Sequence, residues 1–211
     1  MESLLLPGLD AYAAAHSGPV PALYDELHQV TLAETELPQM QVGPLVGRFL
    51  MLVTKLTRAR RAVEIGTFTG YSALSIAEGM VAGGQLTTCD IDPHATAIAQ
   101  RFWDRAPWGD RITLKLGPAL DTLATLEGPL DLAFIDADKT SYSAYWDAIV
   151  PMMRPGGLIL VDNVLWSGTV LAPESDDAKA IATLNRKVAS DDRVDHALLT
   201  LRDGLMMAVK R

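Results

Sequence analysis

Carboxylate and amide side chains follow two apolar segments in the second half of the chain. The segment FIDADK (134–139) places Asp136 at the end of one apolar run, and the segment LVDN (160–163) ends in Asp162 and Asn163. Apolar runs that stop abruptly at polar residues are typical of buried parallel strands. Because ligands bind outside the carboxyl ends of such strands, we expect these side chains to converge if the two strands are neighbours.

These oxygen donors favour a hard divalent cation. Two carboxylates and one amide suit Mg²⁺, Ca²⁺ or Mn²⁺ and match zinc or copper poorly. Lys139 follows Asp136 by three residues, so its amine can reach the same place. Either acid alone is more often an ordinary loop cap, but both together, with Asn163 and Lys139, predict a functional site.

A glycine turn follows an earlier apolar segment. In VEIGTFTGYS (63–72), Gly66 and Gly70 permit a tight turn and a close approach of the backbone to a ligand. Their spacing lacks the G-x-G-x-x-G dinucleotide fingerprint, which disfavours NAD. Asp90 ends the next apolar segment, roughly 20 residues after the turn, where an acid can hydrogen-bond a ribose diol. No basic residue near the turn could hold a pyrophosphate, so a nucleoside without phosphate is the better ligand.

Taken in order, these motifs resemble those of class I S-adenosylmethionine-dependent O-methyltransferases of the caffeoyl-CoA and catechol group, which require a divalent cation. The resemblance spans nearly the whole chain from about residue 38. The matching segments are QMQV (39–42), VEIGTFTGYS (63–72), DIDP (90–93), GPAL (117–120), FIDADK (134–139) and DNVLW (162–166). Each segment is modest alone, but the ordered set is specific.

The resemblance implies a role for each matching residue. The residues expected to bind the cofactor S-adenosylmethionine are Met40, Val42, Glu64, Gly66, Ser72, Asp90, Ala119 and Asp136. Within that set, Glu64, Gly66 and Ser72 would surround the methionine part, Asp90 the ribose and Ala119 the adenine. The metal ligands would be Asp136, Asp162 and Asn163, and the catalytic residues Lys139, as general base, and Asp136.

The expected reaction is methyl transfer to a hydroxyl of a catechol-type small molecule held on the cation. A bound cation would disfavour the ammonium form of Lys139, which suits a general base. The resemblance also implies a homodimer. The acceptor itself stays open, because residues before Pro38 match the family only loosely and often shape the acceptor pocket.

Three alternatives remain. A tRNA-modifying methyltransferase on the same scaffold is the nearest, and only the basic cluster at residues 58–61 favours it. A protein that binds S-adenosylmethionine without catalysis would not need the metal set and Lys139. A dehydrogenase is the weakest, for want of the dinucleotide fingerprint.

The composition agrees with an enzyme in the cytoplasm. The chain has 211 residues, 49% of them hydrophobic, and a net charge of −8, which disfavours broad nucleic-acid binding. No apolar run approaches the ~20 residues that span a bilayer. Residues 1–8 lack a basic region and make a poor signal peptide. The single cysteine, Cys89, excludes an intramolecular disulfide and is expected to pack in the core.

Helical and strand patterns alternate along the chain and predict an α/β fold. Helices are expected at residues 21–36, 44–57, 71–80, 93–106, 119–126, 141–153 and 175–190, and strands at 62–65, 85–90, 112–116, 130–136 and 157–162. This alternation predicts one domain over residues 1–211, with a doubly wound, mostly parallel, Rossmann-like sheet. Residues 1–57 would form a helical segment that contributes to the acceptor pocket. Asp203-Gly204, between apolar runs at 194–201 and 205–210, predicts a C-terminal antiparallel hairpin.

Other conspicuous side chains are expected to be structural. The histidines at 16, 28, 94 and 196 have no zinc spacing and are expected on the surface. Trp103 and Trp108 are expected to cover hydrophobic surface, and Tyr142, Tyr145 and Trp146 to pack in the core. Trp166, just past Asn163, is as suited to wall the acceptor pocket as to pack.

Overall fold

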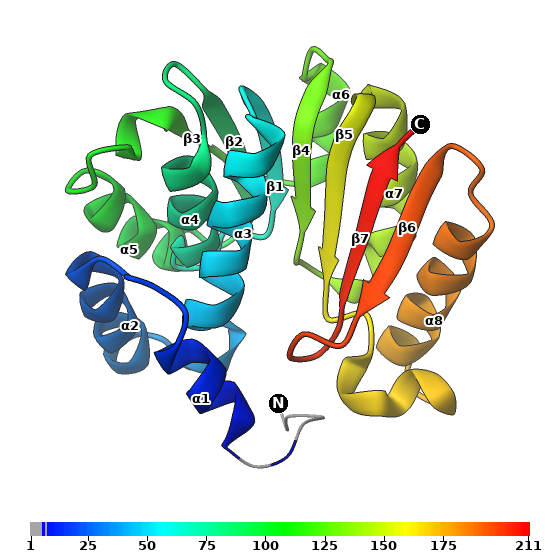
Figure 1. Cartoon of the computed structure of the whole chain (residues 1–211), viewed down its shortest axis with the longest axis horizontal. Coiled ribbons are helices and arrows are strands. Elements are labelled where there is room, and N and C mark those ends of the chain that lie inside the picture. Colours follow the sequence, from blue (N-terminus) through cyan, green and yellow to red (C-terminus); the bar gives the residue numbers. More distant parts are fainter. Residues whose placement is uncertain (1–5, 7) are drawn as a thin grey trace.

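A seven-stranded sheet forms the centre of the molecule (Figure 1). The computed structural model describes residue 6 and residues 8–211. The signal-peptide prediction concerns residues 1–8, most of which lie outside the described residues. The strands are β1 Arg61–Ile65, β2 Gln85–Asp90, β3 Ile112–Leu116, β4 Leu130–Ile135, β5 Met153–Asp162, β6 Val194–Leu199 and β7 Leu205–Lys210. Strands β1 and β4 are buried almost throughout, as their apolar sequences predict.

The strand order is β3-β2-β1-β4-β5-β7-β6. The first five strands of the chain pair in parallel, and β7 pairs antiparallel with both β5 and β6. The chain winds outward in one direction from β1 and in the other from β4, so the boundary between these strands is the topological switch point where such sheets bind ligands. The predicted doubly wound sheet with a terminal antiparallel hairpin is confirmed.

Helices cover both faces of the sheet. They are α1 Leu9–Ala15, α2 Ala22–Glu34, α3 Gly43–Thr57, α4 Tyr71–Gly79, α5 Pro93–Trp103, α6 Ala119–Thr125, α7 Tyr142–Ile149 and α8 Asp176–Ala189. Short 3₁₀ turns are η1 Pro38–Met40, η2 Gly109–Arg111, η3 Lys139–Ser141, η4 Val150–Met152 and η5 Trp166–Leu171. None of the described helices has the length and apolar character needed to cross a bilayer.

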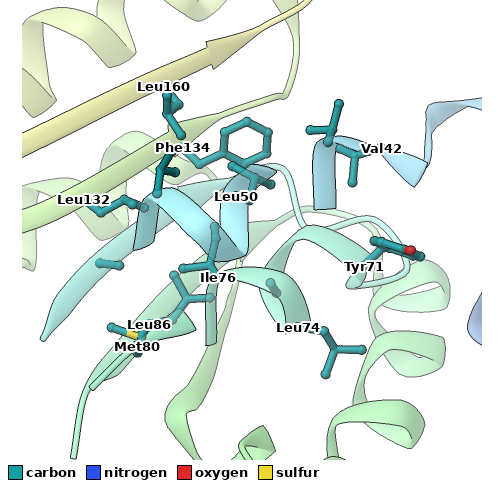
Figure 2. Close-up of a cluster of buried hydrophobic side chains, with 14 of the residues drawn as sticks. Val42, Leu50, Tyr71, Leu74, Ile76, Met80, Leu86, Leu132, Phe134 and Leu160 are labelled. Carbon is teal, nitrogen blue, oxygen red and sulfur yellow. The ribbon is translucent and has the colours of Figure 1, made fainter. Parts of the chain in front are cut away.

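One hydrophobic core lies on each face of the sheet. On the face covered by α2 to α5, Leu50 and Ile76 pack against Phe134 and Leu160 of the central strands (Figure 2). On the other face, α6, α7 and α8 cover side chains such as Ile135 and Val161. Because successive strand residues alternate between the two cores, the ends of β4 and β5 are held rigidly from both sides.

Local signals explain where several elements begin and end. The Asp92 carboxylate accepts the backbone N–H groups of His94 and Ala95 and caps α5, with Pro93 at its first position, as the sequence predicts. Helix α7 ends at Ile149, earlier than expected, because Pro151 cannot continue it. Strand β6 ends at Leu199 rather than residue 201, since the hairpin turn is longer than the Asp-Gly pair alone. Helix α1 lies within residues 1–57, which are predicted to be helical, but its bounds were not predicted.

Candidate active site

A cavity of about 1100 Å³ opens at the carboxyl edge of the parallel strands, the lower edge in Figure 1. Its lining comes from the segments that follow β1, β2, β3, β4 and β5, and from residues 34–37 and 40–42 of the N-terminal segment. The predicted site residues therefore come from well-separated parts of the sequence. The parallel topology brings their strand ends to one edge.

The glycine turn forms the floor of the cavity next to β4. Gly66 has φ +95°, and a Cβ there would lie 1.8 Å from the backbone oxygen of Asp136. The Asp136 N–H also donates to the Ile65 oxygen, at 2.8 Å. Only glycine fits this position, because the chain must turn with positive φ while it contacts the next strand's end. The turn and the Asp136 segment are therefore one rigid unit.

Asp90 organises the same turn through its carboxylate. One oxygen accepts the backbone N–H groups of Thr67 and Phe68 at 2.9 and 2.7 Å, and the other accepts those of Ile91 and Asp92 at 2.7 and 2.9 Å. The side chain lines the cavity while it holds two loops together. A hydroxyl pair of a ligand would meet a carboxylate whose position is already fixed.

Glu64 lies beneath the turn and does not line the cavity. It is fully buried, one oxygen accepts the Thr88 hydroxyl at 2.5 Å, and the other has no hydrogen-bond partner among the described residues. Burial raises the pKa of Glu64 to about 8, against the opposing effect of the Thr88 and Ser72 hydroxyls. The predicted contact of Glu64 with the cofactor stays a prediction, and Ser72, which does line the cavity, is the nearer candidate.

A buried polar network connects the N-terminal segment to the glycine turn. The Gln41 amide nitrogen donates to the hydroxyls of Thr31 and Thr69 at 2.9 and 3.2 Å, and its oxygen lies 2.7 Å from Nδ1 of His28. Thr69 belongs to the turn itself, whereas Thr31 belongs to α2. The network was not predicted, because its members share no sequence motif.

The predicted metal and base residues lie together at the ends of β4 and β5. These strands are neighbours, with Ile135 paired to Val161. The Lys139 ammonium donates to Asp136 Oδ1 at 3.0 Å and to Asn163 Oδ1 at 2.8 Å. A cation, here the ammonium, thus already bridges two of the three expected metal ligands. The third, Asp162, is 4% exposed.

The donor set fits a hard divalent cation. Burial, together with the nearby Asp136 carboxylate, raises the pKa of Asp162 to about 7. A buried acid beside a second carboxylate creates a place where added positive charge is favourable. Among the described residues no group of three or more His, Cys, Asp and Glu could hold a metal, so the expected set depends on the Asn163 amide as its third ligand. Asn163 has φ 61°, a conformation that asparagine tolerates better than most residues.

Two aromatic side chains, Tyr142 and Trp166, lie close to the Lys139 ammonium, and a third, Tyr145, lines the same cavity. The Tyr142 hydroxyl accepts from Lys139 Nζ at 2.5 Å and donates to the Asp162 carbonyl at 3.2 Å. Tyr145 donates to Asp138 at 2.6 Å, and the Trp166 ring centroid lies 5.5 Å from Nζ. Tyr142 and Tyr145 are buried as predicted, but their assignment to core packing alone was incomplete. The i, i+3 spacing of Lys139 and Tyr142 in the sequence could have indicated that these two side chains are in contact.

Nine of the eleven predicted site residues line the cavity: Met40, Val42, Gly66, Ser72, Asp90, Ala119, Asp136, Lys139 and Asn163. Glu64 and Asp162 lie just behind its surface. Other structural expectations hold as well, since Cys89 is buried, with its pKa raised to about 11 by burial, and the four histidines are exposed. His94 nevertheless lines the cavity mouth.

The basic cluster at residues 58–61 lies at the opposite end of the sheet. Arg61 is the first residue of β1, so the cluster precedes the strand whose other end forms the cavity. The Arg61 guanidinium donates to the carbonyl oxygens of Glu127 and Gly128. Arg61 therefore has a structural contact remote from the cavity.

Comparison with known proteins agrees with this geometry. The O-methyltransferase family model matches residues 14–211. Over 171 residues, the chain is 37% identical to catechol O-methyltransferase domain-containing protein 1 of Mus musculus, a match that covers 78% of this chain and 65% of that protein. Over 207 residues, it is 35% identical to probable caffeoyl-CoA O-methyltransferase 2 of Dictyostelium discoideum, covering 94% and 90% of the two proteins.

A solved structure shares the whole fold. The O-methyltransferase from Bacillus cereus in complex with SAH superposes with a TM-score of 0.89 at 32% identity, covering 97% of each chain. The resemblance read from the ordered motifs is thereby confirmed. With a family match over nearly its full length and relatives above 30% identity, the chain belongs to the O-methyltransferase family.

Proposed function

We propose that this protein methylates a hydroxyl of a catechol-type small molecule, with S-adenosylmethionine as methyl donor and a divalent cation in the site. The observation that carries the proposal is the cavity in which Asp136, Asn163 and Lys139 lie beside the glycine turn and Asp90. Cofactor and acceptor would therefore meet at the switch point between β1 and β4.

When bound, S-adenosylmethionine supplies an activated methyl group, and a divalent cation supplies Lewis acidity and a template for two vicinal oxygens. Asp136, Asp162 and Asn163 would hold the cation, with Mg²⁺ the first choice and Ca²⁺ or Mn²⁺ the alternatives. Met40, Val42, Gly66, Ser72, Asp90 and Ala119 would contact the cofactor, and Asp136 would lie between the two ligands.

Lys139 would take the proton of the acceptor hydroxyl at Nζ. In the structure its ammonium donates to Asp136, Asn163 and Tyr142, so its position is fixed by three hydrogen bonds. Because Asp136 and Asn163 are also expected to hold the cation, Tyr142 is the one of these three acceptors that Lys139 would not share with it. A general base in this position typically contributes ~10²–10⁴-fold to the rate. Buried Tyr142, whose pKa is raised well above its ordinary value by burial, would stay a neutral hydrogen-bond partner.

The charge of the cavity favours a neutral or cationic acceptor. The lining includes Glu34, Glu36, Asp90, Asp92, Asp136, Asp138 and Asp177. Among the lining residues, the only basic side chains are Lys139 and His94. A phosphate-bearing thioester would be repelled by this field, whereas a free catechol would not. We therefore place free catechols before acyl-CoA thioesters as substrates, and we expect no nucleic-acid substrate.

The N-terminal segment would shape the acceptor side of one continuous domain. Residues 34–37 line the cavity, and Arg48 and Tyr24 both hydrogen-bond Glu78, which ties α2 and α3 to α4. Variation in this segment would change the acceptor without disturbing the strand ends.

A methyl-transfer assay tests the proposal. Wild-type protein should methylate a neutral catechol, lose turnover in excess chelator, regain it with Mg²⁺ or Mn²⁺, and act poorly on a catechol thioester of CoA. Lys139→Met should lower kcat ~10²–10⁴-fold with cofactor affinity unchanged. Lys187→Met, which removes a surface lysine paired with Asp147, is the matched control and should retain wild-type turnover. Full activity in chelator, with metal content checked by elemental analysis, would refute the cation's role.

A further inference from the structure

A left-handed kink directly after Asp162 and Asn163 shapes one wall of the cavity. Trp166 has φ 47° and Ser167 has φ 54°, so two consecutive non-glycine residues adopt a conformation that L side chains rarely take. Trp166 lines the cavity, with its ring 5.5 Å from Lys139 Nζ. Such a conformation persists only where its surroundings hold it.

The turn of the C-terminal hairpin holds this kink. The Ser167 backbone N–H donates to Oδ1 of Asp203. The N–H groups of Val164 and Leu165 donate to the carbonyl oxygens of Gly204 and Asp203, at 3.1 and 2.9 Å. At Gly204 a Cβ would lie 2.5 Å from Leu165 Cγ, so the turn packs closely against the kinked segment. Three backbone N–H groups on either side of Trp166 are thus tied to two residues of the turn.

Asp203 is buried like a core residue, but it carries a carboxylate, a group more often found in a functional site. It is 2% exposed, and its second carboxylate oxygen has no hydrogen-bond partner among the described residues. A buried acid with half its acceptors unused is a poor choice for stability alone. Burial raises the pKa of Asp203 above its ordinary value, against the opposing effects of the Ser167 N–H and of the Lys139 and Arg202 charges.

Arg202 reaches the opposite wall from the same turn. Its guanidinium donates to the carbonyl oxygens of Val42 and Gln41, the latter at 3.4 Å. Both of these residues line the cavity on the side expected to hold the cofactor. Arg202 itself has φ 49°, so the turn also contains a strained residue. Two consecutive side chains therefore contact the two walls of one cavity.

We propose that the Arg202-Asp203 pair positions both walls of the site: Asp203 sets Trp166 against the acceptor, and Arg202 sets the Gln41–Val42 segment against the cofactor. Neither residue lines the cavity, so each acts through the wall that it holds. The identity of the two ligands rests on the proposed function, whereas the contacts do not. A purely structural turn would contribute to stability and leave the two ligands unaffected.

Kinetics separate these roles. Asp203→Ala should raise the acceptor KM at least tenfold and leave S-adenosylmethionine affinity within threefold of wild type. Asp203→Asn should restore the KM, because the amide oxygen can still accept the Ser167 N–H. Arg202→Met should have the opposite effect: S-adenosylmethionine affinity should fall at least fivefold, and the acceptor KM should stay near the wild-type value. Asp195→Ala on the same hairpin, whose carboxylate pairs with Arg211, is the matched control and should change neither.

A second readout needs no turnover. In protein labelled with ¹⁵N-tryptophan, the Trp166 indole signal, assigned with Trp166→Phe, should shift in Asp203→Ala while those of fully buried Trp103 and Trp146 stay. Adding Ser167→Gly, which removes the left-handed strain, should reverse that shift and keeps the test available where the single variant folds poorly. An unmoved Trp166 signal with unchanged acceptor KM would overturn the inference. Absence of wild-type methylation would instead refute the proposed function.

Discussion

Glu64 and Asp162 are both buried acids with raised pKa values, but their surroundings differ. Glu64 is removed from the cavity and faces the hydroxyl of Thr88, whereas Asp162 lies against Asp136 and Lys139. Burial is the largest cause of the raised pKa in each case. An added cation would offset the cost of burying an ionised Asp162. Glu64 has no such compensation, so burial favours its protonated form in the folded protein.

Glu64 should therefore make stability depend on pH. Its folded pKa of about 8 exceeds the ordinary value of 4.5, so its contribution is fully present below pH 4.5 and is lost as pH rises through 8. A difference of one between the folded and unfolded pKa corresponds to about 1.4 kcal/mol, which predicts a loss of a few kcal/mol across this window. Glu64→Gln cannot ionise, so its stability relative to wild type should increase from pH 5 to pH 9.

Urea unfolding at several pH values measures this difference. Glu174→Gln, at an exposed position, should show no such trend. A constant difference between Glu64→Gln and wild type across pH 5–9 would mean that Glu64 is ionised in the folded protein throughout.

Asp90 should control cofactor affinity in two ways. Its carboxylate fixes the glycine turn through Thr67 and Phe68 and faces the cavity where the ribose is expected. Charge-assisted hydrogen bonds contribute roughly 1.5–3 kcal/mol each. Asp90→Ala should weaken S-adenosylmethionine binding at least about tenfold by calorimetry. Asp110→Ala, exposed and outside the cavity, should leave the affinity at the wild-type value, and an equal affinity for both variants would remove Asp90 from the site.

At the scale of elements, a buried network connects α2 to the glycine turn, with a direct hydrogen bond from the Thr31 hydroxyl to the Thr69 hydroxyl at 2.9 Å and a second link through Gln41. Gln41 bonds Thr31 of the helix and Thr69 of the turn, and it is 6% exposed. Gln41→Leu fills similar space but leaves both hydroxyls without the amide. Loss of a buried hydrogen-bond partner costs about 1–3 kcal/mol.

We expect Gln41→Leu to weaken cofactor binding about five- to tenfold, because Met40 and Val42 would lose their fixed position. Its neighbour Gln39→Leu, at an exposed position, is the control for added apolar surface. If the two variants bind the cofactor equally well, the network supports the fold and does not position the cofactor.

The strand ends were the part of the site that the sequence could predict. Acids and glycines after apolar runs identify the segments at Gly66, Asp90, Asp136 and Asp162, because parallel topology brings such ends together. The contacts of Gln41 and Asp203 could not be predicted, since each joins residues far apart in the chain without a motif. The bounds of α1 could not be predicted because its short, alanine-rich sequence has no buried face. The end of β6 was misplaced because the turn continues through left-handed Arg202.

At the scale of the whole molecule, charge and topology act on the same edge of the sheet. The net charge of −8 is accompanied by an acidic cavity, while the basic cluster lies at the other end. We therefore expect the carboxyl edge to favour cations over anionic acceptors. The homodimer and the cytoplasmic location implied by the sequence stay predictions.

The central claim is that a cation held by Asp136, Asp162 and Asn163 orients two neighbouring oxygens of the acceptor. The most direct measurement is kcat/KM for catechol and for phenol, two neutral acceptors that differ by one hydroxyl, with Mg²⁺ present and after chelation. The account predicts that catechol is preferred at least about a hundredfold with Mg²⁺, because a single hydroxyl loses the chelate orientation. Chelation should abolish turnover of catechol. Equal kcat/KM for the two acceptors in the presence of Mg²⁺ would contradict the assignment of these three residues.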